Sequence, residues 1–198
     1  MLERVCVFAA SSDAAVPVFG EVAAELGRLL GAAGMTLVYG AGKVGLMGSV
    51  ARGVHEAGGH VIGVIPVKLN VDALTYRECD ELVVTETMSE RKSVMTERSE
   101  GFVVLPGGFG TLEELFEVLV LKQLGYHTKP IVFLNTGGAF DGLMAYFAEM
   151  VSLELVKDDQ CDLFMVAETP AAVMEALQSY QPAAVSGKWM EPAPAGQV

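Results

Sequence analysis

The sequence has little positive charge and little cysteine. Its 198 residues include 13 Lys and Arg against 25 Asp and Glu, which gives a formal net charge of −12. Nucleic acids and anionic membrane surfaces attract positively charged proteins, so this balance argues against both as partners. The three cysteines stand far apart in the chain and form no CxxC pair. Because such spacing is typical of reduced thiols, we expect a cytoplasmic protein.

Long apolar runs and clusters of metal ligands are missing as well. Mean hydropathy is high, at +0.41, yet no stretch approaches the roughly 18–20 apolar residues that a membrane-spanning helix needs. The first ten residues lack the basic head and long apolar body of a secretory signal. None of the three histidines has a possible metal ligand four residues further on. We therefore expect neither a membrane span nor a metal site.

The chain does contain short apolar runs that alternate with longer stretches of helical period. Strands that are apolar on both faces and separated by helices are typical of a parallel sheet covered on both sides. The pattern predicts one doubly wound, Rossmann-like α/β domain over residues 1–181, followed by a mobile tail rich in Pro and Ala over residues 182–198. The predicted strands are Arg4–Ala10, Thr36–Tyr39, His60–Ile65, Glu81–Thr85, Phe102–Leu105, Ile131–Leu134 and Leu163–Val166. The predicted helices are Pro17–Ala33, Gly45–Ala57, Met88–Ser99, Thr111–Leu124, Phe140–Glu154 and Ala171–Gln178, and Val67–Asp80 is predicted to be a surface loop.

A first glycine-rich loop, Gly40–Gly48, follows the second predicted strand. Ligands of an open parallel sheet bind at the carboxyl ends of its strands, so such a loop is a candidate site. Its GxGxxG pattern is a weak signal, because the next strand lacks the carboxylate that a dinucleotide fold places there. Leu46 and Met47 occupy the positions where a Walker loop needs Lys and Ser or Thr. A tight turn and an anion site remain equally good interpretations.

A second glycine-rich loop lies between the strand that ends near Pro106 and the helix predicted to begin at Thr111. Gly107, Gly108 and Gly110 free the backbone there, and Thr111 adds a hydroxyl donor. A turn of this kind aims amide groups outward at the positive end of a helix, which is a cradle for phosphate. Three carboxylates crowd the first turns of that helix: Glu113, Glu114 and Glu117.

The alternative for this loop is a capping box, with Thr111 as the N-cap and Glu114 reaching back to it. Acidic residues in a first turn also suit the helix dipole. Capping explains one or two of the carboxylates but not three glycines within four positions. Because glycine loses more backbone entropy on folding than any other residue, the loop needs either unusual dihedral angles or a ligand close to its backbone. The phosphate interpretation is therefore the better one.

Adjacent Arg91 and Lys92 stand out on the predicted helix Met88–Ser99, because the chain is so acidic. A solvated helix face with ion pairs one turn apart would account for them. The start of this helix, however, lies on the same edge of the predicted sheet as the glycine loops. Two cations and three carboxylates beside a phosphate cradle would make a polar catalytic site.

Four segments carry more specific motifs and together cover most of residues 5–155. They are Pro106–Glu114 for PGGxGTxxE, Met88–Lys92 for Met-x-x-Arg-Lys, Val38–Gly48 for YGGGxxGLMG and Gln123–Pro130 for QLGxHxKP. In these motifs the sequence resembles the LOG (LONELY GUY) family of cytokinin riboside 5′-monophosphate phosphoribohydrolases. The resemblance implies hydrolysis of the N-glycosidic bond of purine nucleoside 5′-monophosphates, such as cytokinin nucleotides or AMP. The products would be the free base and ribose 5-phosphate, and the resemblance also implies a homodimer that uses no cofactor.

Carried over to this chain, the family's catalytic positions are Arg91 and Glu114. A carboxylate such as Glu114 would activate water and stabilise the positive charge that builds on the ribose, while Arg91 orients the substrate or stabilises the departing base. We expect Arg91 and Glu114 to face one another across a pocket with free main-chain amides. The expected substrate-binding residues are Lys92, Gly107, Gly108, Phe109, Gly110, Thr111, Glu113 and Glu117.

The chain departs from the family pattern at three places, of which the last two lie near where the base should bind. It has Ala9-Ala10-Ser11-Ser12 where CGSS is common, Ala73 beside Asp72 where an acid is common, and Val120-Leu121 in place of Thr-Trp. A rival of another class is a non-catalytic nucleotide or molybdenum-cofactor carrier, which needs the cradle but no carboxylate at the sugar. A dehydrogenase fits less well. Members have also been labelled lysine decarboxylases, but nothing in this chain marks the pyridoxal phosphate lysine that such an enzyme requires.

Overall fold

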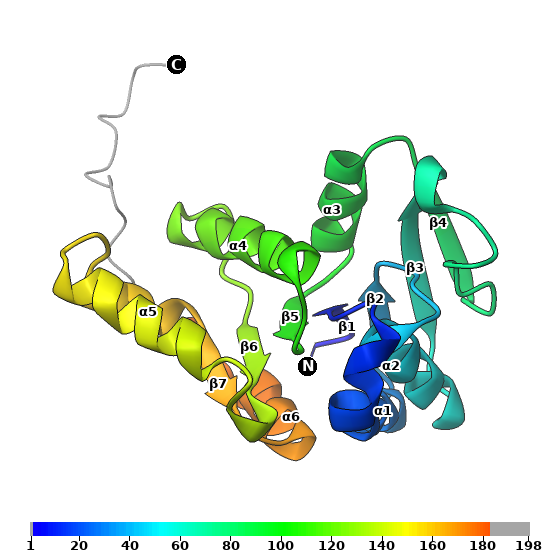
Figure 1. The fold of residues 1–198 in the computed structure, drawn as a ribbon, viewed down its shortest axis with the longest axis horizontal. Coiled ribbons are helices and arrows are strands. Elements are labelled where there is room, and N and C mark those ends of the chain that lie inside the picture. The colour runs from blue at the N-terminus through cyan, green and yellow to red at the C-terminus, as the bar shows by residue number, and fades with distance from the viewer. Residues whose placement is uncertain (1, 183–198) are drawn as a thin grey trace.

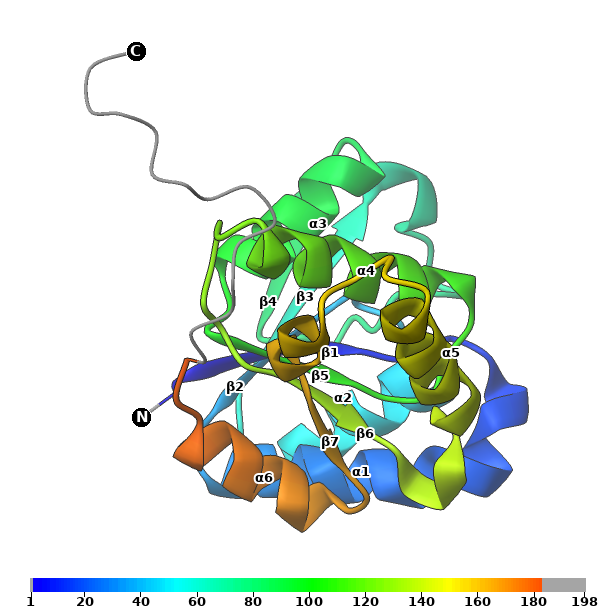
Figure 2. The ribbon, with the colours of Figure 1, turned by 90° about the vertical axis from the view of Figure 1, so that its left-hand side faces the viewer.

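The computed structural model describes residues 2–182, which form a seven-stranded sheet with helices on both faces (Figures 1 and 2). The strands lie in the order β4-β3-β2-β1-β5-β6-β7, and every pair of neighbours is parallel. The strands are β1 (Arg4–Phe8), β2 (Thr36–Tyr39), β3 (Val61–Pro66), β4 (Glu81–Thr85), β5 (Gly101–Val104), β6 (Ile131–Leu134) and β7 (Met165–Ala167). The α-helices are α1 (Val16–Ala32), α2 (Gly45–Glu56), α3 (Met88–Glu97), α4 (Phe109–Gln123), α5 (Asp141–Ser152) and α6 (Pro170–Ser179). Short 3-10 helices are η1 (Asp13–Ala15), η2 (Val67–Leu69), η3 (Thr136–Gly138) and η4 (Asp158–Leu163).

Two apolar cores sandwich the sheet, because successive strand residues point to opposite faces. Val5 and Val7 of β1 join the core beneath α1, α2 and α6. Cys6 and Phe8 join the other core, beneath α3, α4 and α5. Figure 2 shows the two helical layers on either side of the strands. The doubly wound α/β architecture predicted from the sequence is thereby confirmed.

The strand order reverses next to β1, and this reversal positions the site. The chain runs outward from β1 to the edge strand β4, then returns to place β5 on the other side of β1. The loops that follow β1 and β5 therefore diverge and leave a crevice at the carboxyl edge of the sheet. Ligands of doubly wound folds bind at such a point.

The predicted boundaries of the elements agree best with the observed ones where the apolar runs are short and sharply bounded. Thr36–Tyr39, Glu81–Thr85 and Ile131–Leu134 are strands with the predicted limits. The strand predicted over Leu163–Val166 begins later, because η4 occupies the residues before it. The loop predicted over Val67–Asp80 contains the short helix η2. The predicted tail lies outside the described residues from residue 183 on.

No helix within residues 2–182 is both long and apolar enough to cross a membrane. Cys6, Cys79 and Cys161 form no disulfide bond. In the described part of the chain, no three residues of the types His, Cys, Asp and Glu gather where they could hold a metal ion.

Candidate active site

A cavity of about 490 Å³ opens at the carboxyl edge of the sheet. Its walls come from the loops after β1 and β2, from the segment after β3, and from the first turns of α3 and α4. Arg91, Glu113 and Glu114 are its charged lining residues among those described. A second, mainly apolar hollow of about 610 Å³ adjoins it, and Ser12 and Gly108 line both.

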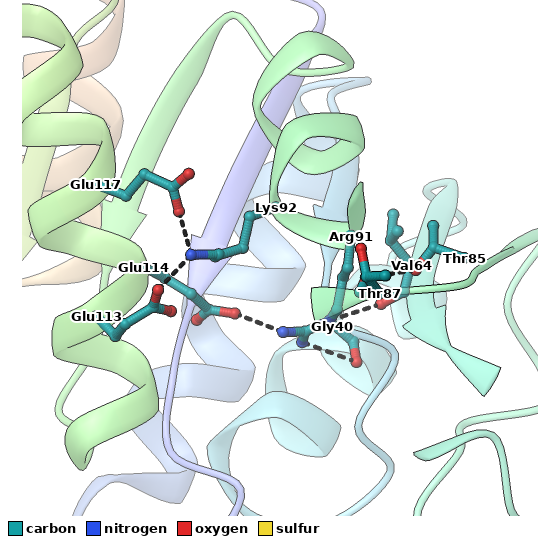
Figure 3. Close-up of polar contacts among 9 residues, drawn as sticks. All are labelled: Gly40, Val64, Thr85, Thr87, Arg91, Lys92, Glu113, Glu114 and Glu117. Atoms are coloured by element: carbon teal, nitrogen blue, oxygen red, sulfur yellow. Dashed lines mark hydrogen bonds and ion pairs between the residues drawn. The ribbon is translucent and has the colours of Figure 1, made fainter. Parts of the chain in front are cut away.

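Arg91 is held by three separate acceptors. Its Nε donates to the carbonyl oxygen of Val64 at 3.0 Å, Nη2 donates to the carbonyl oxygen of Gly40 at 3.3 Å, and Nη1 donates to Oε1 of Glu114 at 2.9 Å (Figure 3). Only glycine fits at position 40, because a Cβ there would overlap the guanidinium. Thr87 fixes the start of α3 by accepting the amide of Glu90. The guanidinium is therefore rigidly oriented and 7% exposed.

Glu114 is the partner of Arg91 and is 9% exposed. Burial raises the pKa of its carboxyl group, and Arg91 opposes that shift by favouring the ionised form. Glu113 adds to the upward shift by repulsion, whereas Lys92 reduces it. A buried carboxylate fixed by one cation is well suited to accept a proton from water. The structure thus brings Arg91 and Glu114 together at one cavity, in direct contact rather than on opposite sides of it.

Lys92, next to Arg91 on α3, makes a separate cluster. Its ammonium group lies between Glu113 and Glu117 of α4, at 2.5 Å from Oε2 of Glu117 (Figure 3). Burial by itself lowers the pKa of Lys92, but hydrogen bonds to the two carboxylates outweigh it and the pKa is raised. Glu113 also lines the cavity, while Lys92 and Glu117 do not. Lys92 therefore ties α3 to α4 beside the site.

The start of α4 differs from the capping box considered above. The helix begins at Phe109 with Gly108 as its N-cap, and no side chain caps it. The capping-box alternative is therefore wrong, because Thr111 lies inside the helix and Glu114 pairs with Arg91. The first helical bond runs from the amide of Leu112 to the carbonyl oxygen of Gly108, at 3.1 Å. The amides of residues 109–111 thus have no acceptor within the helix, and their residues line the cavity.

The three glycines of this second loop differ in what surrounds them. None of them has a positive φ, so unusual dihedral angles are not the cause. A Cβ at Gly107 would overlap the side chain of Thr111. At Gly108 and Gly110 a Cβ would meet no described atom within 4 Å. These two positions leave open space at the amide groups, and the side chain of Phe109 between them is 92% exposed.

The second half of the first glycine loop, Gly45–Gly48, packs against the protein itself. Gly45 has a φ of +64°, and its amide donates to Oδ1 of Asp13 at 2.9 Å. The amide of Met47 donates to the carbonyl oxygen of Ala10 at 3.2 Å. A Cβ at Gly48 would overlap the backbone of Lys43. These contacts favour the tight turn for Gly45–Gly48, whereas Gly40 and Gly42 at the start of the loop line the cavity.

Several residues that line the cavity are not among the site residues predicted from the sequence. Ser11 and Ser12 follow β1 and reach the cavity, as their place after a strand could have suggested. Leu69 and Leu74 line it from the segment after β3, where no motif marked them. Asp72 does not line the cavity, and its carboxylate pairs with Arg77.

Comparison with known proteins places these features in a family. A family model described as "Possible lysine decarboxylase" matches residues 47–177. A probable cytokinin riboside 5′-monophosphate phosphoribohydrolase of Oryza sativa subsp. japonica is 40% identical over 179 residues, which are 90% of this chain and 72% of that protein. A cytokinin riboside 5′-monophosphate phosphoribohydrolase of Arabidopsis thaliana is 39% identical over 180 residues, 91% of this chain and 79% of that protein. The chain belongs to this phosphoribohydrolase family.

A solved protein whose name describes a carrier rather than a hydrolase has a similar fold. The molybdenum cofactor carrier protein of Chlamydomonas reinhardtii superposes with a TM-score of 0.69 at 25% identity, over 90% of this chain and 97% of that one.

The decarboxylase wording of the family model finds no support in the site. No lysine of residues 2–182 lines the cavity, so none can form an imine with pyridoxal phosphate there. Lys122 is buried, with a pKa lowered to about 8 by burial, but its Nζ donates to the carbonyl oxygen of Leu163 at 2.6 Å. The hollow near that lysine measures about 120 Å³ and is mainly apolar. The residues of this phosphoribohydrolase family member do not fit that cofactor.

Proposed function

We propose that this protein hydrolyses the N-glycosidic bond of purine nucleoside 5′-monophosphates and releases the free base and ribose 5-phosphate. The observation that carries the proposal is the buried contact of 2.9 Å between Arg91 and Glu114. The pair lines the same cavity as the first residues of α4, whose amides have no acceptor within the helix. A carrier needs the amides but has no use for a fixed carboxylate beside the sugar. The names of the family's curated members agree with this activity.

The substrate's phosphate binds the amides of residues 109–111 and the hydroxyl group of Thr111. A helix N-terminus favours a dianion there through its dipole and its free donors. Gly108 and Gly110 allow the phosphate to approach the backbone closely, since neither position carries a side chain. This cradle compensates locally for the negative net charge of the chain.

The reaction takes place between the ribose and Glu114. Water forms the new bond to C1′ while the C1′–N bond of the base breaks and its electron pair goes to the base. Glu114 accepts the proton of the attacking water and stabilises the positive charge of the ribose ring. Arg91 fixes the carboxylate of Glu114 and keeps it ionised. The departing base takes up a proton from solvent.

Three further residues have supporting roles in this proposal. Glu113 lines the cavity one residue before Glu114 and binds the ribose hydroxyls. Lys92 and Glu117 lie behind it and hold its carboxylate in place rather than touching the substrate. Phe109, exposed at the rim of the cavity, covers the bound nucleotide.

Both AMP and cytokinin nucleotides are proposed substrates. Leu69, Leu74 and Met88 line the cavity and are each more than 40% exposed, so they offer apolar surface to a base or to an apolar group attached to it. Apolar residues at a cavity rim favour ligands that cover them.

A homodimer is part of the same proposal. The outward faces of α4 and α5 expose Phe116, Val120 and Tyr146, and Leu153 follows directly after α5. An apolar surface of this kind fits a second copy of the chain. Light scattering coupled to gel filtration tests it: the proposal predicts twice the mass of 21.0 kDa.

The second candidate is a nucleotide or molybdenum-cofactor carrier, favoured by the likeness to the Chlamydomonas carrier protein. One experiment separates the two functions. Purified protein is incubated with AMP and, separately, with isopentenyladenosine monophosphate, and free base and ribose 5-phosphate are measured. Hydrolysis yields both products in equal amounts. Binding of AMP without release of adenine would instead establish the carrier.

A further inference from the structure

The turn between α4 and β6 contains the QLGxHxKP motif, for which the proposed mechanism has no use. Helix α4 ends at Gln123, and Gly125 adopts a φ of +81° that turns the chain back. The amide of Tyr126 then donates to the carbonyl oxygen of Leu121 at 2.9 Å. The following residues consequently run back along α4 towards the sheet instead of leaving the helix.

His127 bonds this turn to the middle of α4. Its Nδ1 accepts the amide of Lys129 at 3.2 Å, so the ring proton is on Nε2, which donates to the carbonyl oxygen of Val118 at 2.9 Å. Burial lowers the pKa of His127, which keeps the ring neutral and both bonds intact. The ring also rests against Phe102 of β5, with centroids 5.6 Å apart.

Lys129 carries the turn across to the other helix of the site. Its Nζ donates to the carbonyl oxygen of Thr96 at 2.7 Å, in the last turn of α3. A cation is favoured at a helix C-terminus, where carbonyl groups lack partners within the helix. The same ammonium group lies 5.8 Å from the centroid of the Phe102 ring. Two residues of one short turn thus hold α3 and α4 from a single place.

These bonds lie about one helical turn beyond the reaction centre, because Thr96 follows Arg91 on α3 and Val118 follows Glu114 on α4. Near their N-terminal ends, α3 and α4 are joined through Arg91 and Glu114 and through Lys92 (Figure 3). Further along, the turn joins Thr96 of α3 to Val118 of α4. Each helix contributes one member of the reacting pair, so two separated attachments fix both the distance and the angle between them.

We propose that His127 and Lys129 are positioning residues of the hydrolase site, which hold α3 against α4 so that Arg91 meets Glu114. This inference rests on the proposed function, because its effect on turnover presupposes a reaction. A displacement of about 1 Å at a reaction centre can cost on the order of 100-fold in rate. Loosening the turn should therefore reduce turnover although the substrate never touches it.

Replacement of Lys129 by Met removes the ammonium group and keeps the apolar stem. We expect kcat for AMP to fall about 10- to 100-fold, with KM changed far less, since the phosphate cradle is intact. Lys129→Arg keeps a donor for Thr96 and should recover most of kcat. An equal change of KM and kcat, or no recovery with Arg, would contradict the inference.

Lys122 supplies a matched control. Its Nζ also donates to a backbone carbonyl, that of Leu163 at 2.6 Å, and it lies on α4, but its bond leads to η4 and not to α3. Lys122→Met should lower the melting temperature as much as Lys129→Met does and leave kcat near the wild-type value. If the two variants lost kcat equally, general destabilisation would explain both and the inference would fail.

A second readout needs no turnover. In Lys129→Met, titration of Glu114 followed by carboxyl-carbon NMR should move upward by about 1 pH unit, because Arg91 no longer holds the carboxylate. His127→Leu should produce the same shift if Lys129→Met does not fold. An unchanged titration, or a failure of both variants to fold, would overturn the inference. A wild-type protein that hydrolyses no nucleotide would overturn the proposed function but leave this titration test in force.

Discussion

The two glycine loops look alike in sequence and differ in what surrounds their amides. In Gly40–Gly48 the protein itself makes the close contacts at Gly45 and Gly40: Asp13 accepts from the amide of Gly45, and Arg91 lies where a Cβ of Gly40 would be. At the start of α4, Gly108 and Gly110 border open space beside amides with no helical acceptor. A glycine pattern therefore predicts close approach, but only the surroundings show whether protein or ligand makes that approach.

Of the changes that compare the two loops, Gly40→Ala in the first loop is expected to have the largest effect. The added methyl group overlaps the guanidinium of Arg91 and must push it away from Glu114. Overpacking of this kind should reduce the free energy of unfolding by about 1–3 kcal/mol. We also expect kcat for AMP to fall about 100-fold. Urea unfolding and steady-state kinetics measure the two effects, and normal values in both would show that the first loop is not packed against the site.

Gly108→Ala in the second loop should leave stability almost unchanged and weaken the binding of AMP instead. No described atom stands within 4 Å of the added methyl group, so stability should change by less than about 0.5 kcal/mol. The methyl group occupies space meant for the phosphate, and KM for AMP should rise about 10-fold, which is about 1.4 kcal/mol of binding. Unchanged KM would place the phosphate elsewhere.

The pH dependence sharpens the contrast between the loops. Burial raises the pKa of Glu114 above its usual value of 4.5, so kcat/KM should fall on acidification with an apparent pKa above 4.5. Because the pKa is raised in the folded state, the contribution of Glu114 to stability is fully present below pH 4.5 and is lost as pH rises through the higher, folded value.

Gly40→Ala and Gly108→Ala should differ in the acid limb of their pH–rate profiles. Gly40→Ala moves Arg91 away, so the acid limb of its pH–rate profile should shift further upward. Gly108→Ala leaves Arg91 in place, and its limb should coincide with that of the wild type. A shift in both variants, or in neither, would remove the assignment of the limb to Glu114.

The smallest effect concerns inorganic phosphate. At about five times its Kd, phosphate should raise the melting temperature of the wild-type protein by about 2–4 °C through its binding to the folded state. Gly108→Ala should show less of this stabilisation, because its methyl group intrudes on the cradle. Equal stabilisation of both proteins would indicate binding outside the second loop.

Much of the fold follows from local sequence, and part of the site does not. Runs such as Ile131–Leu134 are buried on both faces, and this alone defines strands of a parallel sheet. The meeting of Arg91 and Glu114 could be anticipated because both helices begin at the same edge of the sheet. The start of α4 was misplaced because Thr111 is a good cap in isolation, whereas tertiary contacts make it line the cavity.

Long-range contacts produce the features of the site that the sequence does not predict. The acceptors of Arg91 at Gly40 and Val64 are backbone atoms 51 and 27 residues away, and no side-chain pattern marks a carbonyl group. The wall made by Leu69 and Leu74 comes from a segment without periodicity. Lys92 was expected in the site with Arg91, but consecutive residues of a helix point in different directions, and Lys92 joins Glu117 outside the cavity.

The most direct test of the central claim is the rate at which Glu114→Gln releases adenine from AMP under single-turnover conditions. Gln preserves the size of the side chain but cannot accept the proton of water. If Glu114 is the base that the buried pair implies, the rate falls about 100- to 10,000-fold while AMP still binds. Release of adenine at the wild-type rate would contradict that role and leave the contact with Arg91 as structure alone.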